Sequence, residues 1–129
     1  MKSYTDLEQS KKLAEILPLE SADMKWYFWK SEIDAPKLPT FGYSKTAAES
    51  YREYTEVIYL ACWSLTALLA VLQKTAYFID EDANVMLDSY KTVEWDLGIN
   101  NSDLELVTES NPVDACYEMI IKLHELNLL

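Results

Sequence analysis

The stretch from Val57 to Leu72, VIYLACWSLTALLAVL, carries no charged residue, so most of it must be buried in any folded state. As one helix it would be about 24 Å long at 1.5 Å per residue, which is shorter than the ~30 Å hydrocarbon layer of a membrane. Ser64 stands directly before a new helical period, where a hydroxyl group caps a helix start. We therefore predict a buried strand over 56–62 and a buried helix over 64–73, in a soluble protein without a membrane span.

The chain has 129 residues, half of them hydrophobic, with only two glycines and four prolines. This length is enough for one core without metals or disulfides, which predicts a single domain over 1–129. The first residues, MKSYTDLEQSKK, are polar and contain no apolar signal core, so nothing in them indicates export. Cys62 and Cys116 are therefore expected to be reduced thiols of a cytoplasmic protein, and a disulfide between them is the less favoured alternative.

The formal net charge of −11 is concentrated in the C-terminal part of the chain. Residues 76–129 hold 12 acidic residues against Lys91 and Lys122, a net of −10, whereas residues 1–56 hold 10 acidic against 8 basic residues. Such a surface repels nucleic acids and anionic membranes. We expect no direct binding to nucleic acid and none to a membrane.

Both ends of the chain carry helix signals. In residues 4–17, Thr5 and Glu8 have capping-box spacing, and Pro18 ends the pattern. The last helix begins at Asn111, which can cap it, with Pro112 at its first position. Its predicted inward stripe consists of Cys116, Met119, Ile120 and Leu123.

Most of the chain between these helices carries strand or loop signals. We predict strands over 25–33 and 84–90, an irregular connection over 34–46 and a short helical segment over 46–54. The fold class is therefore α+β, with an antiparallel sheet of about four strands and about three helices packed mainly on one face.

Residues 92–110, TVEWDLGINNSDLELVTES, predict a hairpin with its loop at 98–103. Pairing Leu97 with Leu104 leaves acidic side chains on the opposite face, with Asp96 directly across from Glu105. Together with a preceding acidic turn, this face is the candidate partner-binding surface. Its predicted residues are Asp80, Glu81, Asp82, Glu94, Asp96, Glu105 and Glu109.

Catalytic and metal sites have weak support in this sequence. Cys116 and the single histidine, His124, are eight residues apart on one helix, about 12 Å along its axis, too far for a nucleophile and its base. Asp80, Asp82 and Asn84 begin like a calcium loop, but the required glycine and final glutamate are missing. We therefore predict no catalytic residues, no cofactor and no metal site.

Three stretches together resemble a family of small uncharacterised proteins of phages and prophages of gut anaerobic bacteria. They are EQSKKLAEIL with ESADM at 8–24, ACWSLTALLAVL at 61–72 and NPVDACYEMIIKL at 111–123. The positions that match are Trp63, Ser64, Leu65, Asn111, Pro112, Asp114 and Ala115. The match is poor over 25–54, and Ala61-Cys62 stands where proline-alanine is usual. The resemblance implies a mobile-element context, a Trp-Ser-Leu helix, several strands and a closing helix, and it implies no activity.

The function expected from these observations is that of a non-enzymatic phage or prophage accessory protein that binds another protein through its acidic surface. The partner would be a host or phage protein, and a specific form of the hypothesis is nucleic-acid mimicry by the acidic side chains. Two alternatives stay open. One is a small hydrolase that uses paired carboxylates, and the other is a structural protein that self-assembles. The oligomeric state is not indicated by the sequence.

Overall fold

The computed structural model describes residues 2–29, 40–41, 57–90 and 94–129. Within these residues three α-helices and two antiparallel sheets confirm the α+β class. The strands form two three-stranded sheets, ordered β2-β1-β3 and β4-β5-β6, in place of the one sheet of about four strands that was expected. The chain divides into two compact units, 6–63 and 1–5 with 64–129, which are described separately below. A single domain over 1–129 stays a prediction.

The unit of residues 6–63 contains α1 (Leu7–Ile16), a 3-10 turn (Leu19–Ser21), β1 (Met24–Trp29), β2 (Thr40–Phe41) and β3 (Val57–Cys62). The capping box of α1 consists of Asp6 and Gln9, one residue later than the predicted pair. Asp6 Oδ1 accepts a hydrogen bond from Gln9 N at 2.8 Å, and Gln9 Oε1 accepts one from Asp6 N at 3.1 Å.

Two tryptophans fix the contacts inside this unit. The Trp26 indole donates to Ser10 Oγ on α1 at 3.1 Å, and the Trp63 indole donates to Ser21 Oγ at 3.0 Å. Trp63 is fully buried, as is Leu13 of α1. Each indole thus buries its apolar ring without leaving its N–H group unsatisfied.

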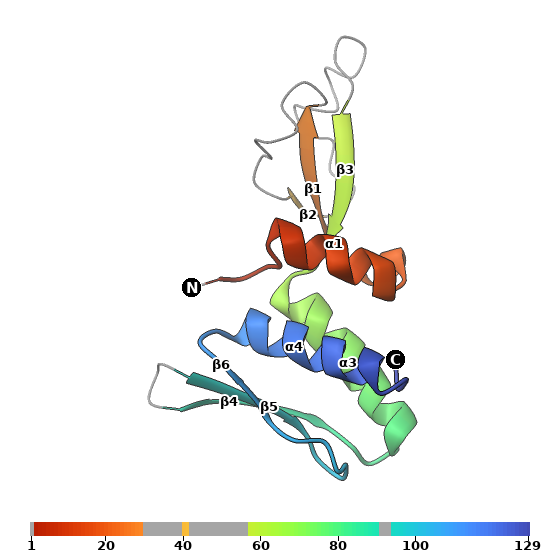
Figure 1. The fold of residues 1–129 in the computed structure, drawn as a ribbon, viewed down its shortest axis with the longest axis vertical. Coiled ribbons are helices and arrows are strands. Elements are labelled where there is room, and N and C mark those ends of the chain that lie inside the picture. The colour runs from red at the N-terminus through yellow and green to blue at the C-terminus, as the bar shows by residue number, and fades with distance from the viewer. Residues whose placement is uncertain (1, 30–39, 42–56, 91–93) are drawn as a thin grey trace. The chain divides into compact units, whose positions relative to one another are not determined.

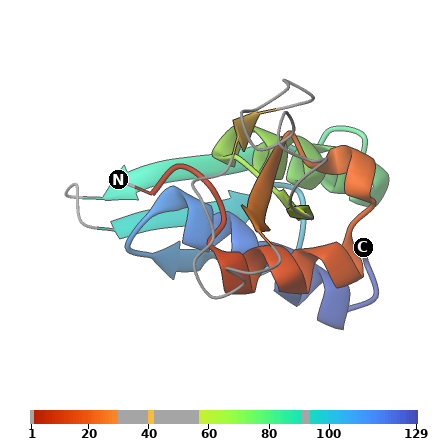
Figure 2. The same cartoon turned by 90° about the horizontal axis from the view of Figure 1, so that it is seen from above.

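The unit of residues 1–5 and 64–129 contains α3 (Leu65–Ile79), β4 (Val85–Tyr90), β5 (Glu94–Ile99), β6 (Val107–Glu109) and α4 (Pro112–Glu125). The helices α3 and α4 contact each other, and both cover the same face of the β4-β5-β6 sheet (Figure 1). Figure 2 shows the two helices in the view from above. Among the described residues of this unit, no helix lies against the opposite face of the sheet.

The predicted strand over 56–62 and helix over 64–73 are confirmed as β3 and α3, but α3 continues six residues beyond the predicted end, to Ile79. Ser64 caps α3, because its side chain accepts a hydrogen bond from Ala67 N at 3.2 Å. Leu68 and Leu72 are fully buried. No helix in the described part of the chain is long and apolar enough to cross a membrane.

The last helix is also confirmed. Asn111 Oδ1 accepts from Asp114 N at 2.9 Å, and Pro112 occupies the first helical turn. The predicted inward stripe of Cys116, Met119, Ile120 and Leu123 is fully buried. This stripe packs on β5 and β6.

The predicted register of the last hairpin is wrong. Leu97 lies opposite Val107 and Trp95 opposite Glu109, so the pairing is displaced by three residues along the second strand. The cause is that residues 103–106 leave the ladder between the turn and β6. A displacement by an odd number of residues exchanges the two faces of a strand, and this moves the predicted acidic side chains.

Some predicted elements fall outside the described residues. The short helical segment over 46–54 lies there, as do residues 30–33 of the predicted aromatic strand and most of the irregular connection over 34–46. The predicted strand over 84–90 is confirmed as β4, which begins one residue later.

Candidate functional site

The outer face of the β4-β5-β6 sheet, opposite the helices, is the candidate site. The register places three carboxylate residues on this face, because side chains alternate along each strand and paired residues share a face. These are Asp88 of β4 with Glu94 and Asp96 of β5, and Thr108 of β6 lies beside them. Leu87, Leu97 and Val107 point to the other face, toward α3 and α4.

Two of the carboxylates are direct cross-strand neighbours. Asp88 lies opposite Asp96, and Asp96 in turn lies opposite Thr108. The Thr108 hydroxyl donates to Asp96 Oδ1 at 2.7 Å, which fixes one carboxylate oxygen. Among the described residues, no lysine or arginine forms an ion pair with Asp88, Glu94 or Asp96. Like charges opposite each other destabilise a sheet, so this arrangement costs the fold some stability.

The same face also carries two large apolar side chains. Met86 lies opposite Gly98, and a Cβ atom added to Gly98 would overlap Cδ2 of Leu106, so Leu106 lies over the glycine. Met86 is 50% exposed and Leu106 is 65% exposed. Gly98 therefore provides the space in which Leu106 lies on the sheet, and the face combines exposed hydrophobic surface with negative charge.

The hairpin residues predicted to share this face lie in different places. Glu94 and Asp96 lie on it, and Asp88 is an additional member that the prediction missed. Glu109 lies opposite Trp95 on the helix side of the sheet. Burial raises the pKa of Glu118 on α4, and the charge of Glu109 raises it further.

Glu105 does not lie opposite Asp96. It belongs to the segment between β5 and β6, outside the ladder, and its backbone carbonyl accepts a hydrogen bond from Lys122 Nζ at 3.4 Å. The position opposite Asp96 is taken by Thr108, so the expected repulsion with Glu105 is replaced by a hydrogen bond. The like-charge neighbour of Asp96 is Asp88 instead.

The predicted acidic residues 80–82 form a turn directly after α3. Asp80 Oδ1 accepts from Asp82 N at 2.8 Å, and the backbone carbonyl of Asp82 accepts from Asn101 Nδ2 at 3.3 Å. The turn therefore lies beside the β5–β6 loop, at the end of the sheet where β4 begins. Asp88 lies three residues into β4 from Val85, about 10 Å along the strand. The acidic turn and the carboxylates of the outer face are thus separate features.

The two residues considered as a catalytic pair are in unlike surroundings. Cys116 is fully buried, and burial raises the pKa of its thiol to about 12, so it is protonated at neutral pH. His124 is exposed, two turns further along α4. Within the described residues, no group of three or more His, Cys, Asp or Glu side chains could hold a metal ion.

Comparison with known proteins gives no match among family models, curated proteins or solved structures. The resemblance to phage and prophage proteins therefore stays a prediction from the sequence. The function has to be argued from the surface itself.

Proposed function

We propose that this chain is a binding protein and that the outer face of the β4-β5-β6 sheet binds a positively charged surface of another protein. The observation that carries the proposal is the set of carboxylates of Asp88, Glu94 and Asp96 beside exposed Met86 and Leu106.

The chemistry of the face supports a protein partner. A solvated sheet face needs polar side chains but has no need of like charges in direct opposition. Lysine or arginine side chains of a partner would relieve the repulsion between Asp88 and Asp96. Exposed Met86 and Leu106 would add apolar contact area, which a protein partner can bury and a small cation from the buffer cannot.

A binding role also suits these carboxylates better than paired-acid catalysis does. A hydrolase would hold its acids in a pocket that buries most of a substrate and perturbs at least one pKa. Asp88, Glu94 and Asp96 instead lie on a sheet face whose other side carries the core.

The more specific form of the proposal is that the acidic face imitates the negative charge of a nucleic acid and occupies the binding surface of a DNA- or RNA-binding protein. The proposed context is a phage or prophage accessory protein that acts in the bacterial cytoplasm on a host or phage protein. The net charge of −10 over residues 76–129 supports this form, because such partners carry basic surfaces.

The experiment is a capture from bacterial lysate with matched charge variants. The face variant is Glu94→Lys with Asp96→Lys, and the control variant is Glu15→Lys with Glu20→Lys. The control changes the net charge equally, at two exposed residues of the unit of residues 6–63. Proteins that bind the unaltered chain and the control, but not the face variant, support the proposal.

Two outcomes would count against it. Equal capture by the face variant would refute binding through this face, provided that circular dichroism shows the variant to be folded. For the mimicry form, excess duplex DNA or RNA should release the captured protein. Failure of both nucleic acids to compete would refute mimicry alone.

A further inference from the structure

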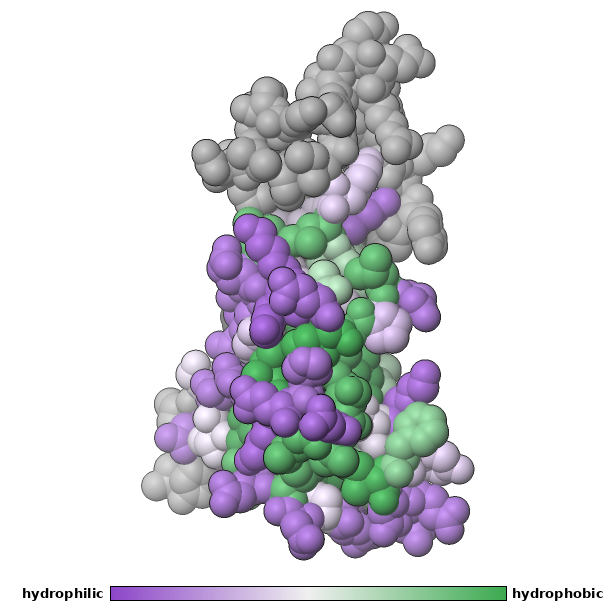
Figure 3. All heavy atoms as spheres, turned by 45° about the vertical axis from the view of Figure 1, so that its right-hand side comes forward, coloured by the Kyte–Doolittle hydropathy of each residue, from purple (hydrophilic) through white to green (hydrophobic). Residues whose placement is uncertain are grey.

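Exposed hydrophobic residues also gather at the C-terminal ends of α3 and α4, away from the acidic face. Tyr77 and Phe78 belong to the last turn of α3, and Leu126 and Leu128 follow the end of α4. Figure 3 shows hydrophobic surface in this region, bordered by hydrophilic side chains. Exposed apolar surface with a polar border is a typical place for a partner to bind.

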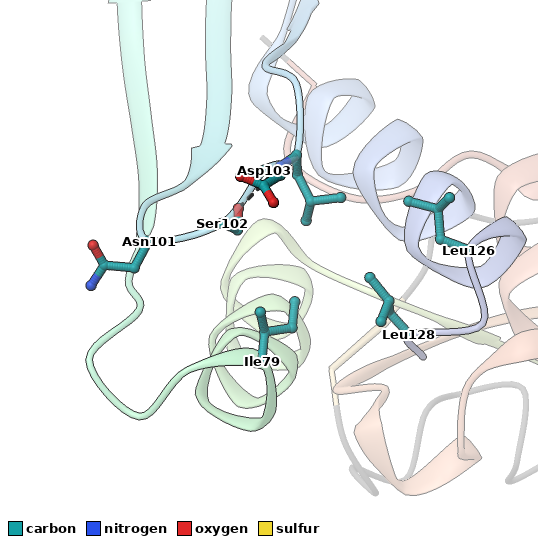
Figure 4. A pocket seen from close by; sticks show the side chains of 7 residues that line it. Ile79, Asn101, Ser102, Asp103, Leu126 and Leu128 are labelled. Atoms are coloured by element: carbon teal, nitrogen blue, oxygen red, sulfur yellow. Dashed lines mark hydrogen bonds between the residues drawn. The ribbon is translucent and has the colours of Figure 1, made fainter.

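A hollow of about 420 Å³ lies between these helix ends and the β5–β6 loop. Its lining residues are Ile79, Asn101, Ser102, Asp103, Leu104, Leu126 and Leu128. In Figure 4 the side chains of Ile79, Leu126 and Leu128 are directed toward a common space, and Asn101 points away from it. The volume is at the lower end of the ~300–1,000 Å³ range of small binding sites, so it suits a short segment rather than a whole helix.

One wall of the hollow is built by the way α4 ends. Asn127 has a φ of 58°, its N–H donates to the carbonyl of His124 at 3.0 Å, and Leu128 N–H donates to the carbonyl of Leu123 at 2.9 Å. These bonds form a Schellman motif, which reverses the chain and holds Leu128 against the end of the helix. The apolar wall is therefore fixed by backbone hydrogen bonds before any ligand arrives.

The opposite wall is a turn of similar construction. Asn101 has a φ of 55°, and the Ser102 hydroxyl donates to the carbonyl of Ile99 at 2.6 Å. Leu104 N–H donates weakly back to Ser102 Oγ at 3.4 Å. These bonds occupy the hydroxyl group of Ser102 within the turn. The surface that the turn presents to the hollow therefore consists of the apolar side chain of Leu104 and the carboxylate of Asp103.

Asp103 is the single charged residue among the described residues that line the hollow. Its side chain is exposed, and the described residues provide no cation for its carboxylate. The hollow thus combines an aliphatic interior with a negative border, which is complementary to a large apolar side chain next to a lysine or arginine.

We propose that the hollow binds a short peptide segment in which a large apolar residue stands beside a lysine or arginine. The apolar side chain occupies the space between Ile79, Leu126 and Leu128, and the cation lies at Asp103. This inference rests on the proposed function, since the segment belongs to the same basic partner. Leu104 lines the hollow and Leu106, two residues later, lies on the acidic face, so one partner can contact both sites.

The test is a methyl NMR titration of the full chain with N-acetyl-leucyl-arginine amide. The matched control ligand is N-acetyl-leucyl-glutamate amide, which has the same apolar side chain and the opposite charge. We expect the arginine peptide to shift the methyl signals of Ile79, Leu104, Leu126 and Leu128. We expect the glutamate peptide to bind at least about tenfold more weakly, because Asp103 repels its carboxylate.

Two variants separate the parts of the proposal. Asp103→Asn should abolish the preference for arginine, and Leu128→Ala should weaken binding of both peptides. Equal affinity of the unaltered chain for the two peptides would overturn the role of Asp103, and no shift in the hollow at saturating peptide would overturn the site. Shifts confined to Met86 and Leu106 would overturn the hollow but leave the acidic face as the binding surface, which the capture experiment tests by itself.

Discussion

Replacing Asp88 with asparagine should stabilise the fold, because Asp88 and Asp96 are direct cross-strand neighbours on the outer face of the sheet. Asparagine keeps the size and polarity of the side chain and removes one of the two charges. The hydrogen bond from Thr108 to Asp96 is retained in this variant, so the substitution isolates the repulsion between the carboxylates.

The size of the effect follows from the separation of the charges. Side chains of directly opposed residues are ~5 Å apart, and two unit charges at that distance in water repel by about 0.8 kcal/mol. Salt at ~0.1 M has a screening length of ~10 Å and reduces this to roughly 0.5 kcal/mol. For a chain of this size, that corresponds to a rise in melting temperature of about 2 °C.

Urea denaturation at two salt concentrations provides the assay, because urea is uncharged and leaves ionic strength under control. At ~20 mM NaCl the midpoint for Asp88→Asn should exceed that of the unaltered chain, and at ~500 mM NaCl the two midpoints should approach each other. Glu105→Gln, which removes an exposed charge outside the ladder, is the control and should change the midpoint less. A neutral or destabilising effect at low salt, or a gain that does not depend on salt, would refute the reasoning.

Further predictions concern α4. Asn111→Ala should cost about 1 kcal/mol in the free energy of unfolding, because the side chain caps Asp114 N–H; an unchanged urea midpoint would contradict the cap. Burial raises the pKa of Cys116 to about 12 from the ordinary thiol value of 9.0, so the unfolded chain loses this proton first as the pH rises. The stability that the buried, protonated thiol contributes is therefore complete below about pH 9 and is lost as the pH rises toward 12, by up to ~1.4 kcal/mol per pH unit. The difference in free energy of unfolding between the unaltered chain and Cys116→Ala should therefore narrow between about pH 9 and about pH 12. Burial and the charge of Glu109 raise the pKa of Glu118, which means that the ionised carboxylate destabilises the folded chain. Glu118→Gln should therefore stabilise the fold at neutral pH and lose this advantage in acid, where Glu118 is protonated. Thermal melts over a range of pH check this prediction and the one for Cys116.

The helices could be predicted because their signals are local. Ser64 and Asn111 cap α3 and α4 as their positions indicate, and a cap depends on a side chain and an amide a few residues apart. The buried stripe of α4 follows from helical periodicity in the same way. The cap of α1 differed by one residue, since Asp6 and Gln9 provide the same chemistry as the predicted pair.

The strand register could not be predicted because alternation alone fits more than one pairing. Leu104 and Leu106 have the spacing of inward strand residues, yet Leu104 lines the hollow and Leu106 lies over Gly98. Residues 103–106 thus leave the ladder for contacts that no local pattern encodes, and every later pairing is displaced.

The same displacement explains which site residues were found and which were missed. Glu94 and Asp96 were assigned to an acidic face because they alternate within β5, which is a local property. Asp88 was missed because its position opposite Asp96 depends on the pairing of β4 with β5. Glu109 was wrongly placed on that face because its side follows from the register of β6, and Glu105 lies outside the ladder altogether.

The central claim, that the acidic outer face is the binding surface, is tested most directly by dissociation constants for a captured partner. Isothermal titration should compare the unaltered chain, the face variant Glu94→Lys with Asp96→Lys, and the control variant Glu15→Lys with Glu20→Lys. We predict that the face variant binds about tenfold more weakly or worse, while the control stays within roughly twofold. Equal weakening of the two variants would show that only net charge matters, and unchanged affinity of the face variant would contradict the claim outright.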